Sequence, residues 1–258
     1  MAGKGGSGFR SALTEVGEIA EFTGRFFRNA FHARFEWREL IRQCTVNGAL
    51  TLPLVGITAF IMGLVLTVQS RPTLARFGAE SMLPAMVAIS MVREIAPVIT
   101  ALICAGKIGS SMGAELGSMR VTEQIDAMEV SGTNPFRYLV VTRVWSTTLM
   151  LPILVVLADV IAIVACWMGV NMYGTVSWPL FQHQVVDALS YSDLIPAFIK
   201  TYLFGLVIGL VGCHAGWHAE KGTTGVGNAA HRAVVVGSLL VFILDLVAVQ
   251  FTDLVGIN

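Results

Sequence analysis

The stretch SMLPAMVAISMVREIAPVITALICAGKIGSSMGAELGSMRVTEQIDAMEV, residues 81–130, decides the fold. Its first part is an apolar segment of membrane-crossing length that contains the adjacent charges Arg93 and Glu94. A glycine-rich run follows at residues 106–117, and polar residues dominate from 115 to 130. This last part is too short and too acidic to cross a bilayer. The stretch therefore predicts a charged membrane helix followed by a short helix at the membrane surface.

The composition places the chain among polytopic membrane proteins. Hydrophobic residues make up 55% of the 258 residues and charged residues only 13%, whereas a soluble domain has about 25% charged residues. The mean hydropathy is +0.71. Seventeen basic and seventeen acidic residues give a formal net charge of zero, so no overall basic field indicates nucleic acid as a partner.

Five membrane spans are predicted from long apolar runs. The first, residues 45–70, carries no charge over 26 residues, and at about 1.5 Å per residue it exceeds the roughly 30 Å hydrocarbon core. The other four runs are residues 81–106, 144–170, about 194–216 and 233–252. We therefore expect an all-α polytopic membrane protein with five transmembrane helices.

The residues before the first span predict an amphipathic helix that lies in the membrane interface. From residue 11 to about 42, aromatic and aliphatic side chains recur at helical spacing, with arginines between them. The alternative is a soluble helix packed on a partner. The apolar members are Leu13, Val16, Ile19, Phe22, Phe26, Phe27, Phe31 and Phe35, and the basic ones are Arg25, Arg28, Arg34 and Arg38. The chain thus divides into residues 1–44, the tail and interfacial helix, and residues 45–258, the five-span domain.

The distribution of basic residues predicts the orientation. Thirteen of the seventeen Lys and Arg residues lie in segments on the same side as the N-terminus, and only Arg71 and Arg76 lie on the opposite side. Because basic loops stay in the cytoplasm, the N-terminus is expected there. Five spans then place the C-terminus on the other side.

Arg93 and Glu94 are candidates for a substrate pathway. An ionised side chain near the middle of a span costs about 2.5–3.5 kcal/mol, so such residues usually face a polar cavity or a partner. Neighbours on a helix point about 100° apart, so the two residues need different partners. Pro97 leaves the carbonyl of Arg93 without its helical hydrogen bond, which favours a kink. The alternative is that both side chains snorkel to a surface or form a structural ion pair.

Asp159, Lys200 and Asp245 are further charged residues inside predicted spans. For these three, structural pairing between helices is favoured over a role in substrate binding. Asp245 lies in the middle of its span and is expected to neutralise Arg93 from another helix. Lys200 lies near the start of its span and is expected to snorkel.

Residues 115–130 predict a cytoplasmic helix between the second and third spans. Val121, Ile125 and Met128 form an i, i+4, i+7 stripe, and Gly132 has the position of a C-cap. A short helix with such a stripe suits docking into a groove of a soluble partner. The alternative is a helix lying on the lipid surface, but its acidic excess disfavours anionic headgroups.

The chain lacks the motifs of an enzyme. It has no G-x-x-x-x-G-K-[ST] sequence for nucleotide and no G-x-S-x-G elbow. His214 and His218 lie four residues apart beside Cys213, but without an H-E-x-x-H frame a zinc site is disfavoured. We therefore expect no catalytic residues, metal or cofactor in this chain, and the chain cannot hydrolyse nucleotide itself.

Four segments carry a resemblance to a known family. They are Val92-Arg93-Glu94-Ile-Ala-Pro97; Ala105-Gly106-Lys107-Ile-Gly109-Ser110; Ala114-Glu115-Leu-Gly117-Ser-Met-Arg120-Val-Thr122-Glu123-Gln124-Ile-Asp126-Ala-Met128-Glu129; and Asn134-Pro135 with Arg143. These segments closely resemble the MlaE/YrbE permeases, the membrane subunits of ABC-type lipid transporters that work with mammalian-cell-entry (MCE) proteins. Gln69, Ala79-Glu80, Gly225-Val226-Gly227 and Leu244-Asp245 extend the resemblance to nearly the whole chain.

The resemblance implies a homodimeric permease of the inner membrane that moves phospholipid or a similar lipid, with its C-terminus in the periplasm. Two cytoplasmic ABC ATPase subunits, which bind ATP and Mg, would dock near residues 115–129, an MCE-domain protein would bind the periplasmic face, and some members add a STAS-domain protein. Two alternatives to this function remain: a membrane-embedded lipid-modifying enzyme that uses Glu94 as acid or base, and a passive scaffold for an MCE assembly. The substrate-pathway residues would be Arg93, Glu94, Gln69, Pro97 and Asp245. The ATPase-coupling residues would be Glu115, Arg120, Glu123, Ile125, Asp126, Met128 and Glu129.

Overall fold

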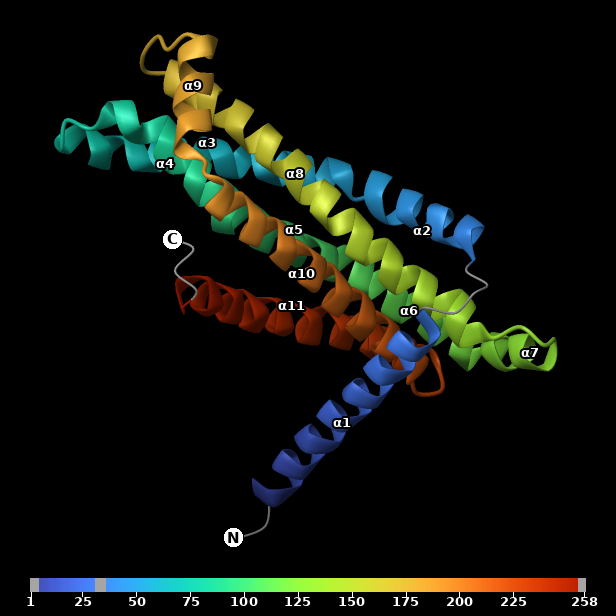
Figure 1. The fold of residues 1–258 in the computed structure, drawn as a ribbon. Helices are drawn as coiled ribbons and strands as arrows, with labels where there is room; N and C mark the ends of the chain where they lie inside the picture. The colour runs from blue at the N-terminus through green and yellow to red at the C-terminus, as the bar shows by residue number, and fades with distance from the viewer. Residues whose placement is uncertain (1–4, 31–35, 255–258) are drawn as a thin grey trace.

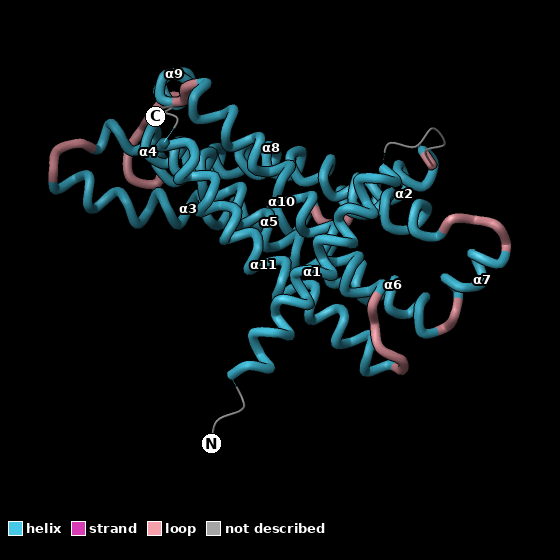
Figure 2. The backbone as a smooth tube through the Cα atoms, turned by 60° about the horizontal axis from the view of Figure 1, so that its bottom comes forward, coloured by secondary structure: helices cyan, strands magenta, loops and turns pink. Residues whose placement is uncertain are grey.

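The computed structural model describes residues 5–30 and 36–254, with side chains from residue 17 onward, and this part of the chain is helical without strands (Figure 2). In chain order the elements are α1 (Gly5–Ala30), α2 (Trp37–Ala49), α3 (Leu52–Arg76), the 3₁₀ turn η1 (Glu80–Met82), α4 (Leu83–Ser90), the π-helical segment η2 (Met91–Ile95), α5 (Ala96–Cys104), the π-helical segment η3 (Ala105–Gly109), α6 (Ser110–Val121), α7 (Gln124–Val130), the π-helical segment η4 (Phe136–Val141), α8 (Thr142–Asn171), α9 (Trp178–Ala188), α10 (Tyr191–Trp217) and α11 (Thr223–Leu254).

Five helical runs in the described residues are long and apolar enough to cross a membrane, which confirms the predicted fold class. They are Trp37–Arg76, Glu80–Val121, Phe136–Asn171, Tyr191–Trp217 and Thr223–Leu254. Each run contains one predicted span. The runs are longer than the predicted spans because the polar residues that flank the apolar ones are also helical. The division expected near residue 44 falls inside α2, within the first run.

The spans form one bundle whose two ends carry different elements (Figure 1). One end has α7, the start of α2 and the loop between α10 and α11. The other end has α9 and the α3–α4 connection, and the two views agree on this arrangement (Figures 1 and 2). The loops therefore alternate between two faces, as in a polytopic membrane protein.

Close helix packing in the bundle depends on glycine. A Cβ atom added at Gly205 of α10 would lie 2.7 Å from the carbonyl oxygen of Thr147 in α8. One added at Gly113 of α6 would lie 2.9 Å from the carbonyl oxygen of Ala229 in α11. Helices in membranes associate through small residues of this kind, because backbones can then approach closely.

The N-terminal helix α1 packs against the helix bundle through part of its aromatic face. Phe22 and Phe26 of α1 are buried, and the Phe22 ring lies 5.1 Å from that of Phe136. Arg25 stacks over Phe136, its guanidinium carbon 4.4 Å from the ring centroid. The remainder of α1 projects from the bundle (Figure 1).

The interfacial-helix prediction therefore needs one correction. A single helix from about residue 11 to 42 was expected, but α1 ends at Ala30 and α2 begins at Trp37. Within the described side chains, two of the aromatics cover the bundle's own core and so do not face lipid. Leu13, Val16, Phe31, Arg34 and Phe35 of the predicted pattern lie outside the described side chains.

The prediction of one continuous helix over residues 115–130 is also wrong, because two helices cover this segment. Its first half belongs to α6, which continues the second span to Val121. Glu123 then adopts a left-handed conformation with φ of 58°, and α7 starts at Gln124. A break was not expected there, because no glycine or proline marks it. The predicted end is confirmed, since Gly132 has φ of 81° and its N–H donates to the carbonyl of Glu129 over 3.0 Å.

Candidate functional site

Arg93 and Glu94 lie on the π-helical segment η2, just before Pro97. The N–H of Ala96 bonds to the carbonyl of Met91, one residue further back than in an α-helix. A wider turn suits this position because Pro97 has no N–H to offer to the carbonyl of Arg93. Such π turns occur often at functional sites. The predicted disturbance before Pro97 therefore takes the form of a widened turn.

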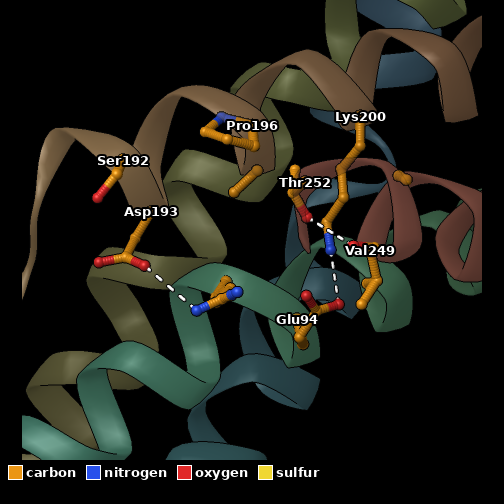
Figure 3. A pocket seen from close by; sticks show the side chains of 10 residues that line it. Glu94, Ser192, Asp193, Pro196, Lys200, Val249 and Thr252 are labelled. Atoms are coloured by element: carbon orange, nitrogen blue, oxygen red, sulfur yellow. Dashed lines mark hydrogen bonds and ion pairs between the residues drawn. The ribbon is translucent and has the colours of Figure 1, made fainter. Parts of the chain in front are cut away.

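A buried lysine joins two carboxylates from different helices. The Nζ atom of Lys200 in α10 lies 2.6 Å from Oε2 of Glu94 and 3.0 Å from Oδ1 of Asp245 in α11. The Lys200 side chain is only 6% exposed, against 38% for Glu94 and 20% for Asp245. Figure 3 shows Lys200 reaching from α10 toward Glu94. We call Glu94, Lys200 and Asp245 the charged triad.

This geometry corrects two predictions. Asp245 neutralises Lys200, whereas the sequence suggested Arg93 as its partner. Lys200 does not snorkel; its ammonium group is held inside the bundle by two carboxylates. The expectation of pairing between helices is correct for both residues. It fails for Asp159, whose buried Oδ1 atom has no hydrogen-bond partner within the described residues.

Arg93 pairs with an aspartate that the sequence reading missed. Its Nη1 atom lies 3.5 Å from Oδ1 of Asp193, at the start of α10. The other carboxylate oxygen, Oδ2, accepts a hydrogen bond of 2.6 Å from the hydroxyl of Ser190. Ser190 and Asp193 form a capping box, so the Ser-x-x-Asp spacing was the available signal for Asp193. Arg93 and Glu94 therefore have different partners, as their angular separation predicts.

A small cavity lies between the two ion-pair systems. It has a volume of about 30 Å³, and its lining includes Arg93, Glu94, Asp193 and Lys200 as well as Thr252 of α11 (Figure 3). A cavity of this size holds about one water molecule. In this conformation the space is small and the charged groups satisfy one another, while the side chains of Arg93 and Glu94 remain 34% and 38% exposed. Any larger ligand must separate the helices and exchange with these ion pairs.

The other two predicted pathway residues lie outside this cavity. Pro97 is buried in α5 and shapes the turn that carries Arg93, but it does not line the cavity. Gln69 is exposed on α3 and is also absent from the lining. The structure therefore brings Arg93, Glu94 and Asp245 together with Lys200 and Asp193.

The predicted coupling residues form a second candidate region. Arg120 of α6 pairs with Asp126 of α7 over 2.7 Å, across the break at Glu123. Glu115 of α6 pairs with the buried Arg143 of α8 over 3.2 Å. The first pair connects α7 to the second span, and the other connects the second span to the third.

The apolar stripe of α7 faces its own protein. Ile125 is 1% exposed and belongs to the main hydrophobic core, and Met128 packs against that core. Glu123, Asp126 and Glu129 are exposed. The surface that α7 leaves for a partner is therefore acidic, whereas the sequence suggested an apolar one.

His214 and His218 contribute to packing. Their ring centroids lie 4.4 Å apart, and both rings make edge contacts with Phe22 of α1. Within the described residues, no group of three or more His, Cys, Asp or Glu side chains is placed to hold a metal ion.

The comparison with known proteins decides the family. The family model for permease MlaE matches residues 40–251. This chain belongs to the MlaE permease family. The match includes the charged triad and α7, covers three of the five spans completely and covers most of the first and the fifth.

Relatives of this MlaE-family permease include ABC transporter subunits. The chain is 36% identical over 208 residues to the probable ABC transporter permease protein RP096 of Rickettsia prowazekii, covering 79% of each chain. It is 34% identical over 221 residues to the probable ABC transporter permease protein slr1045 of Synechocystis, covering 86% of this chain and 84% of the relative. A third relative is the chloroplastic protein TRIGALACTOSYLDIACYLGLYCEROL 1 of Arabidopsis thaliana, 29% identical over 228 residues, covering 88% of this chain and 65% of the relative.

As an ABC transporter permease of the MlaE family, the chain is a non-catalytic transmembrane component that works with ATPase subunits. The alternative of an enzyme that uses Glu94 is therefore excluded. In the structure the carboxylate of Glu94 is paired with Lys200.

Proposed function

We propose that this permease moves phospholipid or a similar lipid between the inner membrane and an MCE-domain protein, driven by ATP hydrolysis in its partner subunits. The observation that carries the proposal is the charged triad, enclosed between three spans with the Arg93–Asp193 pair beside it. A phospholipid headgroup offers a phosphate to the cations and, in many lipids, an ammonium group to the carboxylates. It can thus replace these ion pairs without leaving a buried charge unpaired.

The sequence relatives support a lipid as the cargo. The name of the Arabidopsis relative contains that of a galactolipid. The exposed apolar faces of the spans also provide surfaces for acyl chains, each buried CH₂ contributing about 0.8 kcal/mol. Five helices enclose little volume by themselves, so the proposal includes a homodimer with a larger cavity between the two copies.

The motion is proposed to start at α7. Its acidic surface and the Arg120–Asp126 pair would receive the movement of the ATPase. From there α6, η3, α5 and η2 form one helical run back to Arg93 and Glu94. A tilt of α7 would therefore act on the triad through a continuous element.

The distribution of charge supports the proposed orientation. The basic segments lie at the end of the bundle that has α7, where the ATPase subunits and, in some relatives, a STAS-domain protein would bind. We propose that this end faces the cytoplasm, and that α9 and the C-terminus face the periplasm and the MCE protein.

The test is lipid transfer by the reconstituted complex. The permease, its ATPase and the MCE protein are placed in vesicles that contain a fluorescent phospholipid, and lipid gained or lost by the MCE protein is measured with and without ATP. We expect transfer that requires ATP, and lipids retained on the purified complex should be detected by mass spectrometry. Transfer without ATP contradicts the proposal. Full transfer after scrambling residues 123–129 supports a passive scaffold instead.

A further inference from the structure

A second cavity lies between α8 and α9, and Figure 1 shows α9 at the end of the bundle opposite α7. Its volume is about 760 Å³, far larger than that of the cavity at the triad. The walls include Val160, Ile163 and Val164 of α8, and Phe181 and Val185 of α9. We call this cavity the α8–α9 groove. It is apolar, and the charged triad does not contribute to it.

The groove is continuous with the bilayer-facing surface of the third span. Val160 is 56% exposed and Val164 is 38% exposed, and both lie in a helical run that crosses the membrane. The same exposed face continues down α8 through Val156, which is 46% exposed. Hydrocarbon is therefore the medium that reaches the opening of the groove.

One edge of the groove is polar. His183 and Asp187 lie on α9 at its rim, and their side chains form a pair at 2.5 Å that is 76% and 63% exposed, respectively. Trp178 also lines the groove and makes an edge contact with Trp167 of α8, with centroids 5.3 Å apart. Tryptophan is enriched where hydrocarbon meets headgroups. The rim is therefore at headgroup level and the floor is in the hydrocarbon region.

The side chains favour an acyl chain over a transmembrane helix as the occupant. Helices in membranes pack through small residues, and this protein does so at Gly205 and Gly113. The groove presents Val160, Ile163 and Val164 on α8 instead. Branched side chains of this size keep a second backbone at a distance but make good contacts with a flexible hydrocarbon chain.

We propose that the α8–α9 groove binds an acyl chain of a phospholipid from the leaflet at the C-terminal end of α8, with the headgroup at the His183–Asp187 rim. This site is separate from the charged triad. The two are connected by α9 and the first turn of α10, because the segment that ends the groove leads directly to Asp193, the partner of Arg93. Binding in the groove needs no ATP; a role as a step in transport rests on the proposed function.

The test is photo-crosslinking in vesicles of phosphatidylethanolamine that contain a trace of phosphatidylcholine with a diazirine on its acyl chain. The full-length permease is labelled without nucleotide, digested and mapped by mass spectrometry. Labelling at residues 160–164 and 178–187 is compared with that at Leu239 and Leu246 of α11, which are 57% and 63% exposed in this chain and serve as the reference for apolar surface outside the groove. We expect about tenfold enrichment in the groove, as for a site that holds about two more methylenes than the open surface.

Filling the groove should remove this enrichment. Val164→Trp and Val160→Trp place a large side chain in it from exposed positions, whereas Val156→Trp adds the same side chain on the same face of α8 outside the lining. Enrichment should fall to the α11 level in the first two variants and persist in the third. Equal labelling of groove and α11 in the wild-type protein, or equal loss in all three variants, would overturn the proposal. The proposal would also be overturned if a photo-crosslinking amino acid placed at position 164 attached a polypeptide, and no lipid, in native membranes. Because labelling is measured without ATP, a failure of transport would leave the result unchanged.

Discussion

The two halves of α10 are held in the bundle by different forces. The first half carries Asp193 and Lys200, which bind Arg93, Glu94 and Asp245 through ion pairs. The second half carries Gly205 and further glycines that bring its backbone against α8 and α6. A charged ligand can replace one partner of an ion pair, whereas no ligand group can replace a close contact between two helix backbones. The first half is therefore suited to opening and the second half to staying closed.

Removing Lys200, the cation shared by Glu94 and Asp245, should have the largest effect on stability and on lipid transfer. Lys200→Met leaves Glu94 and Asp245 without their shared counter-ion. Breaking a fully buried ion pair costs about 3–5 kcal/mol, and the cost here should lie toward the lower value because the Glu94 and Asp245 side chains are 38% and 20% exposed. We expect the variant to melt at a lower temperature in detergent and to lose lipid transfer in the reconstituted complex.

The triple variant Lys200→Met, Glu94→Gln, Asp245→Asn separates stability from function. Since no charge is left unpaired, most of the stability should return, while lipid transfer should stay absent. Normal transfer by this variant would show that the triad only holds the fold.

A substitution in the second half of α10 should have an intermediate effect. Gly205→Ala places a Cβ atom 2.7 Å from the carbonyl oxygen of Thr147, and overpacking of this kind costs about 1–3 kcal/mol. Thermal melting of the purified protein measures the loss. Gly227→Ala in α11 is the matched control, because nothing lies within 4 Å of its added Cβ atom. Equal melting temperatures for the two variants would contradict the distinction between the halves.

The smallest effect on stability is expected at the surface. Asp126→Asn breaks the pair with Arg120, whose side chains are 54% and 42% exposed, and such pairs contribute about 0–1 kcal/mol. The melting temperature should hardly change, but lipid transferred per ATP hydrolysed should fall several-fold if α7 receives the motion. Glu18→Gln, an exposed acid on α1, serves as the control for a general effect of charge.

The sequence was sufficient to predict the spans and the unusual character of Arg93 and Glu94. Long uncharged runs have few structural alternatives, and adjacent charges inside one of them must find partners. It could not show which partners, because Lys200 is 106 residues from Glu94 and the pairing depends on how α10 packs against η2. Asp193 was missed although it has a recognisable capping position.

The break at Glu123 shows a different limit. Val121, Ile125 and Met128 follow a helical period through it, so the pattern of apolar residues conceals the interruption. The apolar stripe is present, but Ile125 is buried in the core, so the stripe packs α7 against the rest of this protein. Periodicity identifies an apolar face and does not say whether that face meets the same chain or another.

The π turn at η2 means that a small change in helix winding can change the direction of Glu94. A π turn contains one residue more than the bonding pattern of an α-helix accommodates, and successive residues in a helix differ by about 100° in direction. If that turn tightened to α-helical winding, the helix on one side of it would rotate by about 100° relative to the other side, and Glu94 would change its direction by up to that angle. The ion pair of Glu94 with Lys200 would then break, so a small change of winding is enough to weaken the attachment of α10 to the second span.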